Sequence, residues 1–277
     1  MDGSIRTQVE AIHNGGVRFA LAVTGGGARA VTWLIGVPGA SKSILDVQVP
    51  YSHEALEGYL GYSVEQAVTA KVAVDMARTA STRAKCLVPD IPMIVAVGCT
   101  AGIATNRPKR GEHLCYVSLS TPPGASVHRL AFVKGIRDRD GEDDLVSRLI
   151  LRAVADGIGV PFGLDLALEA GEQIEVSFEN LAVLIEALQR GRVRSACVAS
   201  DGSISAGQSV RGGVLSGSFD PLHEGHKGLA LAASHLLGQP VTFELSITNV
   251  DKSPLDVSDV ERRIGQFAGK YDVVVTQ

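Results

Sequence analysis

Cysteine is scarce in this sequence, and its spacing excludes the usual cysteine-based scaffolds. The four cysteines are Cys86, Cys99, Cys115 and Cys197, so the chain has no C-x-x-C pair and no zinc-ligand pairing with its histidines. A disulfide framework is therefore not expected, and a reducing, cytoplasmic setting is the simplest interpretation. Aromatic residues make up only 5% of the chain, which argues against stacking platforms for single-stranded nucleic acid.

Long apolar runs and long runs of one charge are also lacking. The first apolar stretch, residues 19–37, is interrupted by glycines and by Arg29, so neither a signal peptide nor a membrane span is predicted. Lysine and arginine total 26 against 30 aspartates and glutamates, a net charge of −4, and we expect no nucleic-acid partner and no membrane partner. With 277 residues, 45% of them hydrophobic, the chain is long enough to bury a sizeable core.

The first half of the chain alternates patterns typical of strands and of helices. Short apolar segments predict buried strands, and segments with apolar residues on one face predict helices. The strands are expected at residues 17–23, 47–51, 93–97 and 114–119, and the helices at 28–35, 65–80 and 143–155. This alternation favours a three-layer α/β fold.

The pattern changes between residues 157 and 211. A helix is predicted at 179–190 and a small hairpin at 193–199 and 203–206, followed by a polar segment containing glycine and serine. We therefore expect a first domain at 1–160, a connecting helix and hairpin at 161–210, and a further domain at 211–277.

The most informative segment follows this boundary. An apolar strand beginning at Val214 runs into a turn with glycine and proline, G-S-F-D-P-L-H-E-G-H at 217–226, which opens a helix over 227–237. Such a turn presents backbone N–H groups and the positive end of the helix dipole to an anion, for which phosphate is the natural guest. His223 and His226 can both face that anion, and Gly225 leaves room for a base or a phosphate.

This turn resembles the H-x-G-H signature of the nucleotidyltransferase superfamily, the adenylyl- and cytidylyltransferases with a Rossmann-like fold. Within the superfamily it resembles the nicotinamide and nicotinate mononucleotide adenylyltransferases more than the cytidylyltransferases. The resemblance implies that His223 and His226 contact the triphosphate of ATP or CTP, bound with Mg²⁺, while an acceptor phosphate displaces pyrophosphate from the α-phosphorus. It also implies further nucleotide contacts in the turn, at Gly217, Ser218, Phe219, Asp220 and Gly225. The alternative is that His223 only caps the turn and His226 only begins the helix.

The resemblance extends to the end of the chain. A second strand is predicted at 242–247, and the loop after it resembles the place where mononucleotide adenylyltransferases carry a lysine, here Lys252. A helix from Ser258 carries Arg262 and Arg263, of which Arg263 is favoured as a phosphate contact. A solvated helix face is the alternative for these basic residues.

A third strand is predicted at 272–276, and the sequence stops directly after it. The resemblance therefore covers only the first half of such a domain, and a truncated sequence is the expected explanation. That strand is expected to expose an unpaired sheet edge unless a partner covers it. A homo-oligomer is one assembly that the sequence leaves open.

Residues 17–155 resemble a second family, the CinA C-terminal domains, whose active members are nicotinamide mononucleotide deamidases. Three segments carry the match: A-V-T-G-G at 22–26, G-V-P-G-A-S at 36–41 and Y-S-H-E-A-L at 51–56. The family's catalytic serine and lysine are replaced by Ala22 and Leu56, which have no group to act as nucleophile or base. Deamidation should be lost, although Thr24, Gly25, Gly26 and Tyr51 remain as a possible phosphate or nucleotide contact.

The leading hypothesis is therefore a nucleotidyltransferase that moves AMP from ATP to a phosphate acceptor such as nicotinamide or nicotinate mononucleotide. The alternatives are a non-catalytic nucleotide-binding protein with a degenerate deamidase domain and, third, a residual deamidase. Two histidine and glutamate pairs, His53 with Glu54 and His113 with Glu112, are expected to be solvated. No metal site within the protein and no serine-hydrolase elbow are predicted.

Overall fold

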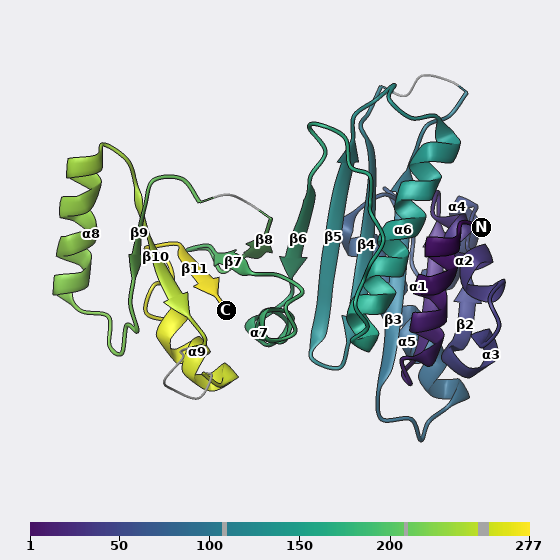
Figure 1. The fold of residues 1–277 in the computed structure, drawn as a ribbon, viewed down its shortest axis with the longest axis horizontal. Helices are drawn as coiled ribbons and strands as arrows, with labels where there is room; N and C mark the ends of the chain where they lie inside the picture. The colour runs from purple at the N-terminus through teal and green to yellow at the C-terminus, as the bar shows by residue number, and fades with distance from the viewer. Residues whose placement is uncertain (107–109, 208–209, 249–254) are drawn as a thin grey trace. The chain divides into compact units, whose positions relative to one another are not determined.

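The computed structural model describes residues 1–106, 110–207, 210–248 and 255–277. The chain divides into two compact units, Met1–Ile174 and Glu175–Gln277 (Figure 1). The expected division put a connecting segment at 161–210, whereas most of that segment belongs to the second unit. No helix in the described part of the chain is both long enough and apolar enough to span a bilayer.

The first unit is built on a mixed sheet in the order β2-β1-β3-β4-β5. Its strands are β1 (Arg18–Thr24), β2 (Ile44–Gln48), β3 (Ile94–Gly102), β4 (His113–Thr121) and β5 (Gly124–Phe132). Strand β1 is parallel to both β2 and β3, whereas β4 runs antiparallel to its two neighbours, β3 and β5. The carboxyl ends of β1 and β3 therefore meet at one edge, next to the glycine turn that follows Thr24.

Helices cover both faces of this sheet. They are α1 (Gly3–Asn14), α2 (Ala28–Ile35), α3 (Ala40–Ser43), α4 (His53–Leu60), α5 (Ala70–Leu87) and α6 (Arg139–Ile158). Apolar residues of α1, α2 and α6 form one buried cluster with the sheet, and those of α4 and α5 form another. The expected three-layer α/β arrangement is confirmed (Figure 1).

A glycine in β3 sets how closely α5 packs on the sheet. A Cβ atom at Gly98 would lie 2.2 Å from the carbonyl oxygen of Ala73 and 2.5 Å from the backbone nitrogen of Ala77. No other residue fits there without moving the helix, because real Cβ contacts are longer than 3.0 Å. Gly98 thus fixes α5 against the middle of the sheet, and α5 in turn covers the neighbouring strands.

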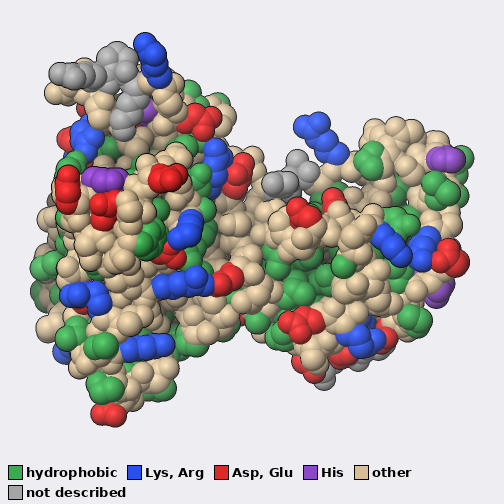
Figure 2. Space-filling model, turned by 180° about the vertical axis from the view of Figure 1, so that it is seen from behind, with side chains coloured by type: hydrophobic (Ala, Val, Ile, Leu, Met, Phe, Trp, Pro, Cys, Tyr) green, Lys and Arg blue, Asp and Glu red, His purple; other side chains and the backbone are tan. Residues whose placement is uncertain are grey.

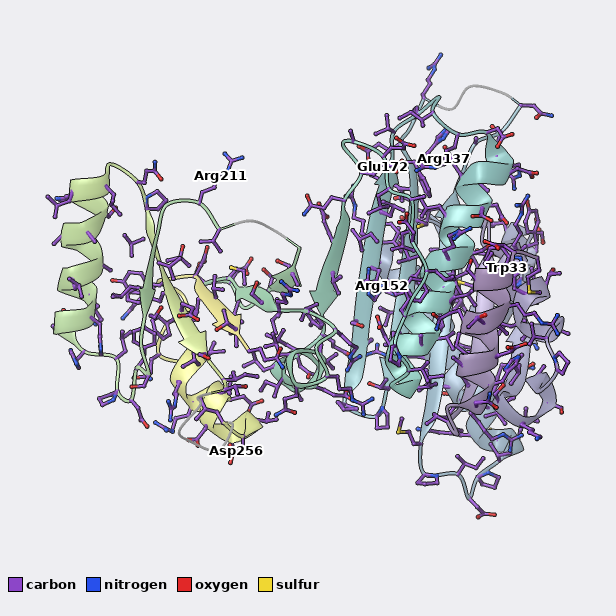
Figure 3. The ribbon with its side chains drawn as sticks, viewed as in Figure 1. Trp33, Arg137, Arg152, Glu172, Arg211 and Asp256 are labelled. Atoms are coloured by element: carbon purple, nitrogen blue, oxygen red, sulfur yellow. The ribbon has the colours of Figure 1, made fainter. Side chains whose placement is uncertain are left out.

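The segment that follows α6 is tied back to the first unit by polar contacts. Gln8 of α1 donates to the carbonyl of Pro161 (3.1 Å) and accepts from the N–H of Gly163 (2.8 Å). Arg137 pairs with Glu172 at 2.6 Å (Figure 3). Burial raises the pKa of Glu172, but hydrogen bonds from Arg137 and from backbone N–H groups outweigh it, so the pKa is lowered overall. Residues 159–173 therefore belong to the first unit.

The surface of the first unit agrees with the small net charge. Acidic and basic side chains alternate over the face of this unit shown in Figure 2, and no patch of one sign forms on that face. Arg29 is an example, since its guanidinium lies within 4 Å of Asp140, Asp143 and Asp144. Such exposed pairs contribute little to stability, but they prevent the single-sign field that attracts polyanions.

The strands of the second unit are hydrogen-bonded in the order β6-β8-β7-β11-β10-β9. Its strands are β6 (Ile174–Phe178), β7 (Ser195–Val198), β8 (Ile204–Ala206), β9 (Gly213–Ser216), β10 (Val241–Ser246) and β11 (Val273–Thr276). Its helices are α7 (Leu181–Gln189), α8 (Glu224–Leu237) and α9 (Val257–Ile264). Strands β9, β10 and β11 are mutually parallel, as in a Rossmann-like half.

The expectation of an unpaired C-terminal strand is wrong. Strand β11 pairs with β10 on one side and, antiparallel, with β7 on the other, where Val274 faces Cys197. The predicted hairpin is confirmed as β7 and β8. It was expected to connect two domains, but its strands pair with β11 and β6 of the second unit. The edge that the sequence was expected to leave open is therefore covered by this chain.

Several boundaries in the first unit also differ from expectation. The strand predicted at 47–51 is β2 at Ile44–Gln48, and the helix predicted at 65–80 is α5 at Ala70–Leu87. Helix α5 begins later because the hydroxyl of Thr69 accepts from the N–H of Val72 and caps it there. Strand β5 and helices α1, α3 and α4 were not predicted.

Candidate functional site

The candidate site is the turn between β9 and α8 in the second unit. Strand β9 ends at Ser216, and the N–H of Gly217 still donates to the carbonyl of Glu244 in β10 (3.1 Å). Helix α8 begins at Glu224 with His223 as its N-cap. The turn thus lies beyond the carboxyl end of a parallel strand and at the positive end of a 14-residue helix. This is where open α/β sheets bind ligands.

Phe219 anchors the turn in the core of the second unit. Its side chain is fully buried, and its ring meets the rings of His226, Phe243 and Phe267 at centroid distances of 5.1, 5.6 and 5.2 Å. Gly217 is required beside it, because a Cβ there would lie 2.7 Å from the Phe219 ring. Both residues were predicted to contact a nucleotide. Phe219 can offer a ligand only its backbone, so its side chain shapes the turn.

The two histidines of the turn are brought together. Their rings are stacked with centroids 3.8 Å apart and planes inclined by 21°, and the backbone N–H of His223 donates to Nδ1 of His226 (3.3 Å). Since Nδ1 of His226 accepts this bond, the neutral ring carries its proton on Nε2. Partial burial and the neighbouring His223 lower the pKa of His226 below its ordinary value.

Gly225 serves the histidine pair. A Cβ at this position would lie 3.1 Å from two atoms of the His223 ring, so a larger residue would press on that ring. The sequence predicted that Gly225 leaves room for a base or a phosphate. In the structure, the ring of His223 occupies space on that side of the glycine.

Asp220 binds the two arginines of α9. Its carboxylate accepts from both Nη atoms of Arg262, at 2.5 and 3.2 Å, and lies 3.3 Å from Arg263. The hydrogen bonds from Arg262 hold the pKa of Asp220 below its usual range. Arg263 also donates to the carbonyl of Ser218 (3.1 Å). The side chain of Arg262 is 52% exposed and that of Arg263 only 12%. Arg263 was favoured as the phosphate contact, but Arg262 is the more accessible of the two.

Gln266, which follows α9, holds the turn in place and was missed by sequence reasoning. Its Nε2 donates to the carbonyl of Phe219 (2.9 Å), and its Oε1 accepts from the N–H of Leu222 (2.8 Å). This one amide side chain thereby forms hydrogen bonds with two backbone groups of the turn that lie more than forty residues earlier in the sequence. No local pattern around Gln266 carries that information. Lys252, the other predicted phosphate contact, lies outside the described residues.

The first unit places Ala22 and Leu56 in one buried apolar cluster, between the sheet and helices α4 and α5. Ala22 is fully buried and Leu56 is 2% exposed, so neither position faces a ligand. The hydroxyl of Thr24 donates to the carbonyl of Pro50 (2.8 Å). At the positions where the resemblance puts a catalytic serine and lysine, the chain has core packing.

Other residues of the first unit fill the end of the sheet that carries the glycine turn. Gly25 has φ +79°, and a Cβ there would overlap the carbonyl oxygen of Ala101 at 1.9 Å. Arg139, at the start of α6, donates to the Tyr51 hydroxyl (3.2 Å) and to the carbonyl of Ala104 (2.9 Å). Gly26 is also close to the β3 side, where a Cβ would meet Ala101 at 3.2 Å. Tyr51 is 66% exposed and remains accessible.

The expectation that His113 is solvated is wrong. It is 8% exposed, and its Nδ1 lies 2.8 Å from the carboxylate of Glu142, which is 1% exposed. The second oxygen of Glu142 accepts from the N–H of Ala104 (2.6 Å). This pair joins β4 to α6 and secures the segment that follows β3. His53, in contrast, does not lie on a strand: it begins α4, where its side chain is 53% exposed and pairs with Glu57 at 3.3 Å.

Comparisons with known proteins give limited further information. No protein-family model matches the chain, and no curated protein matches it significantly. Among solved structures, the chain is similar to a competence/damage-inducible protein, CihA, from Agrobacterium tumefaciens, with 21% identity, TM-score 0.43, and 56% of this chain and 93% of that chain covered. It is also similar to a competence-damaged protein (CinA) superfamily protein from Klebsiella pneumoniae, with 16% identity, TM-score 0.44, and coverages of 57% and 98%. A third similar structure is a competence-damaged protein (CinA) superfamily protein from Escherichia coli, with 17% identity, TM-score 0.44, and 56% of this chain and 91% of that chain covered.

Proposed function

We propose that the second unit takes part in nucleotidyl transfer, moving AMP from ATP to the phosphate of an acceptor such as nicotinamide or nicotinate mononucleotide. The observation that supports this most is the stacked pair of His223 and His226 at the N-terminal end of α8. Two imidazoles, the first N–H groups of the helix and its dipole converge there on the position where an anion would bind.

The proposed reaction is a displacement at phosphorus. An oxygen of the acceptor phosphate attacks the α-phosphorus of ATP, the bond to the bridging oxygen breaks, and pyrophosphate leaves with the electron pair of that bond. His226 donates from Nε2 to a triphosphate oxygen, and its Nδ1 stays fixed by the N–H of His223. No covalent enzyme intermediate is needed, so the residues act by positioning and by charge stabilisation. CTP is the alternative donor.

Mg²⁺ would accompany the triphosphate. In the described part of the chain no group of three or more metal-ligating side chains comes together. Asp220 is engaged by Arg262, and Glu224 by Lys227 at 2.6 Å, so the turn does not present free carboxylates. We therefore assign the ion no protein ligand, since Mg²⁺ is commonly held through substrate phosphates and water.

The test is pyrophosphate release from ATP on addition of either mononucleotide. His226→Ala should lower the rate by about 100-fold, as expected when one preorganised donor to a developing charge is removed. His235→Ala is the matched control, because His235 is an exposed histidine in the last turn of the same helix. Equal rates for the wild type and His226→Ala, with both folded by circular dichroism, would refute the assignment.

Calorimetric titration with ATP, run beside this assay, separates catalysis from binding. Saturable ATP binding without release of pyrophosphate would favour the non-catalytic nucleotide-binding protein. For the first unit we propose no deamidase activity, on the observation that Ala22 and Leu56 are packed in an apolar cluster. Release of ammonia from nicotinamide mononucleotide by the wild-type chain would overturn that proposal.

A further inference from the structure

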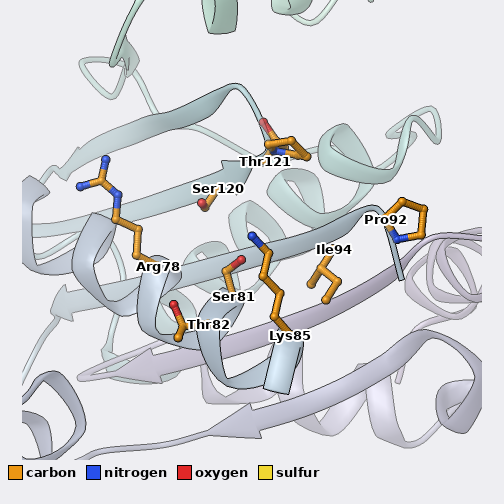
Figure 4. A pocket seen from close by; sticks show the side chains of 9 residues that line it. Arg78, Ser81, Thr82, Lys85, Pro92, Ile94, Ser120 and Thr121 are labelled. Carbon is orange, nitrogen blue, oxygen red and sulfur yellow. The ribbon is translucent and has the colours of Figure 1, made fainter. Parts of the chain in front are cut away.

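The first unit has a pocket of about 360 Å³ at the opposite end of its sheet from the glycine turn. It lies where Ile94 begins β3 and where β4 ends at Thr121, beneath the C-terminal half of α5 (Figure 4). Its volume is at the lower end of the range for small-molecule sites, roughly 300–1,000 Å³. None of the residues discussed for the glycine turn or for the histidine turn lines it.

Two cations of α5 face this pocket. Arg78 and Lys85 are seven residues apart, which is two helical turns and therefore the same face of the helix. Both are exposed, and no acidic residue is among the residues that line the pocket. Asp75, on the same helix, is held by Lys71 at 2.6 Å and by the hydroxyl of Tyr62, and it also interacts electrostatically with Arg78. The lining itself thus holds two cationic groups and no carboxylate, which favours an anionic ligand.

Hydroxyl groups line the space between the two cations. Ser81 and Thr82 come from α5, and Ser120 comes from β4 on the other side (Figure 4). Thr121 also lines the pocket, although its hydroxyl donates to the carbonyl of Gly124 (3.3 Å). A hydroxyl can turn its proton towards an oxyanion, so these side chains supply neutral donors beside the charged ones.

The remaining wall is apolar. Ile94 and Pro92 line it on one side (Figure 4), and Pro122 of the turn after β4 is also part of the lining. Such a surface offers nothing to a free inorganic ion, but it can contact the carbon skeleton of an organic ligand.

We propose that this pocket binds a small organic phosphate monoester. The guanidinium of Arg78 can donate two hydrogen bonds to phosphate oxygens, and the ammonium of Lys85 supplies a second charge for a dianion. Ser81, Thr82 and Ser120 donate to the remaining oxygens, while the organic group lies against the apolar wall. The proposal is independent of the function proposed for the histidine turn.

The test is titration of the ¹⁵N-labelled chain with ribose 5-phosphate and with inorganic phosphate, followed by amide shifts. Saturable shifts should be largest at Ser81, Thr82, Ser120 and Thr121, and ribose 5-phosphate should bind more tightly than phosphate. Sodium chloride at matched ionic strength controls for general screening. Because the probes report each amide separately, binding at the histidine turn is seen as a distinct set of shifts.

The variants are Arg78→Gln, Lys85→Gln and, as a matched control, Arg83→Gln. Each single change at the pocket should weaken ribose 5-phosphate binding about tenfold or more, since each removes a charge-assisted hydrogen bond. Arg83 is on the same helix but pairs with Asp46 at 3.0 Å, outside the pocket, so its replacement should leave the affinity unchanged. Both pocket residues are exposed, and thermal unfolding should confirm that the variants fold.

Two results would overturn the proposal. One is an unchanged affinity in the Arg78→Gln/Lys85→Gln double variant. The other is a set of shifts spread over surface cations and reproduced by chloride, which would mean general screening and no site.

Discussion

Replacement of Phe219 by alanine tests whether the histidine turn is held in place by the core of the second unit. The Phe219 side chain is fully buried and is surrounded by the rings of His226, Phe243 and Phe267. Truncating a buried phenylalanine costs about 3–5 kcal/mol, which includes the cavity that it leaves. The second unit spans residues 175–277, and domains of such size have total stabilities of about 5–15 kcal/mol. Phe219→Ala should therefore remove a large part of its stability.

Urea unfolding gives the measurement. With a slope of about 1–3 kcal/mol per molar urea, a loss of this size lowers the midpoint of the second unit by at least about 1 M. Far-UV circular dichroism follows both units and Trp33, the single tryptophan, follows the first, so the transition of the second unit is the part of the far-UV change without a matching change in fluorescence. Leu231→Ala is the control, since Leu231 is 60% exposed and its truncation should cost less than about 0.5 kcal/mol. A loss below about 1 kcal/mol for Phe219→Ala would refute the reasoning.

Three further outcomes are expected. Leu56→Lys should destabilise the first unit by about 3 kcal/mol or more in urea unfolding, because it replaces a buried apolar side chain by an ammonium group without a partner. Burial lowers the pKa of His13, so the unfolded chain binds a proton at this residue more readily than the folded chain does. The stability of the first unit, followed through Trp33, should therefore fall as the pH drops below about 6.5, and His13 should cause no change above that pH. His13→Gln should flatten this dependence. The pKa of His226 is lowered too, so ATP affinity by calorimetry should rise as the pH falls through the region below about 6.5, and His226→Gln should lose this rise.

The turn was predictable from sequence because its determinants are local. Ten consecutive residues, 217–226, contain the glycines, the proline and both histidines, and strand, turn and helix follow one another along the chain. Helix α1 could have been found by the same reasoning, since Asp2 caps it and Ile5, Val9 and Ile12 lie on its buried face.

What was missed depends on contacts between distant segments. Gln266 reaches two backbone groups of the turn, and Glu142 reaches His113 across 29 residues. The antiparallel pairing of β7 with β11 is of the same kind, because the hydrophobic pattern identifies a strand but not its neighbour. The buried pair also shows why His113 was misjudged: an isolated histidine and an isolated glutamate each look solvated until the fold brings them together.

The most direct measurement is an ATP titration of the full chain followed through the ring signals of its histidines. The sequence has seven histidines, so the signals of His223 and His226 can be assigned by single substitution. We predict that the ring signals of these two histidines shift together and saturate with ATP, whereas the ring signal of His235, on the same helix, does not shift. ATP binding that leaves His223 and His226 unshifted, or no ATP binding at all, would contradict the assignment of the turn as a nucleotide site.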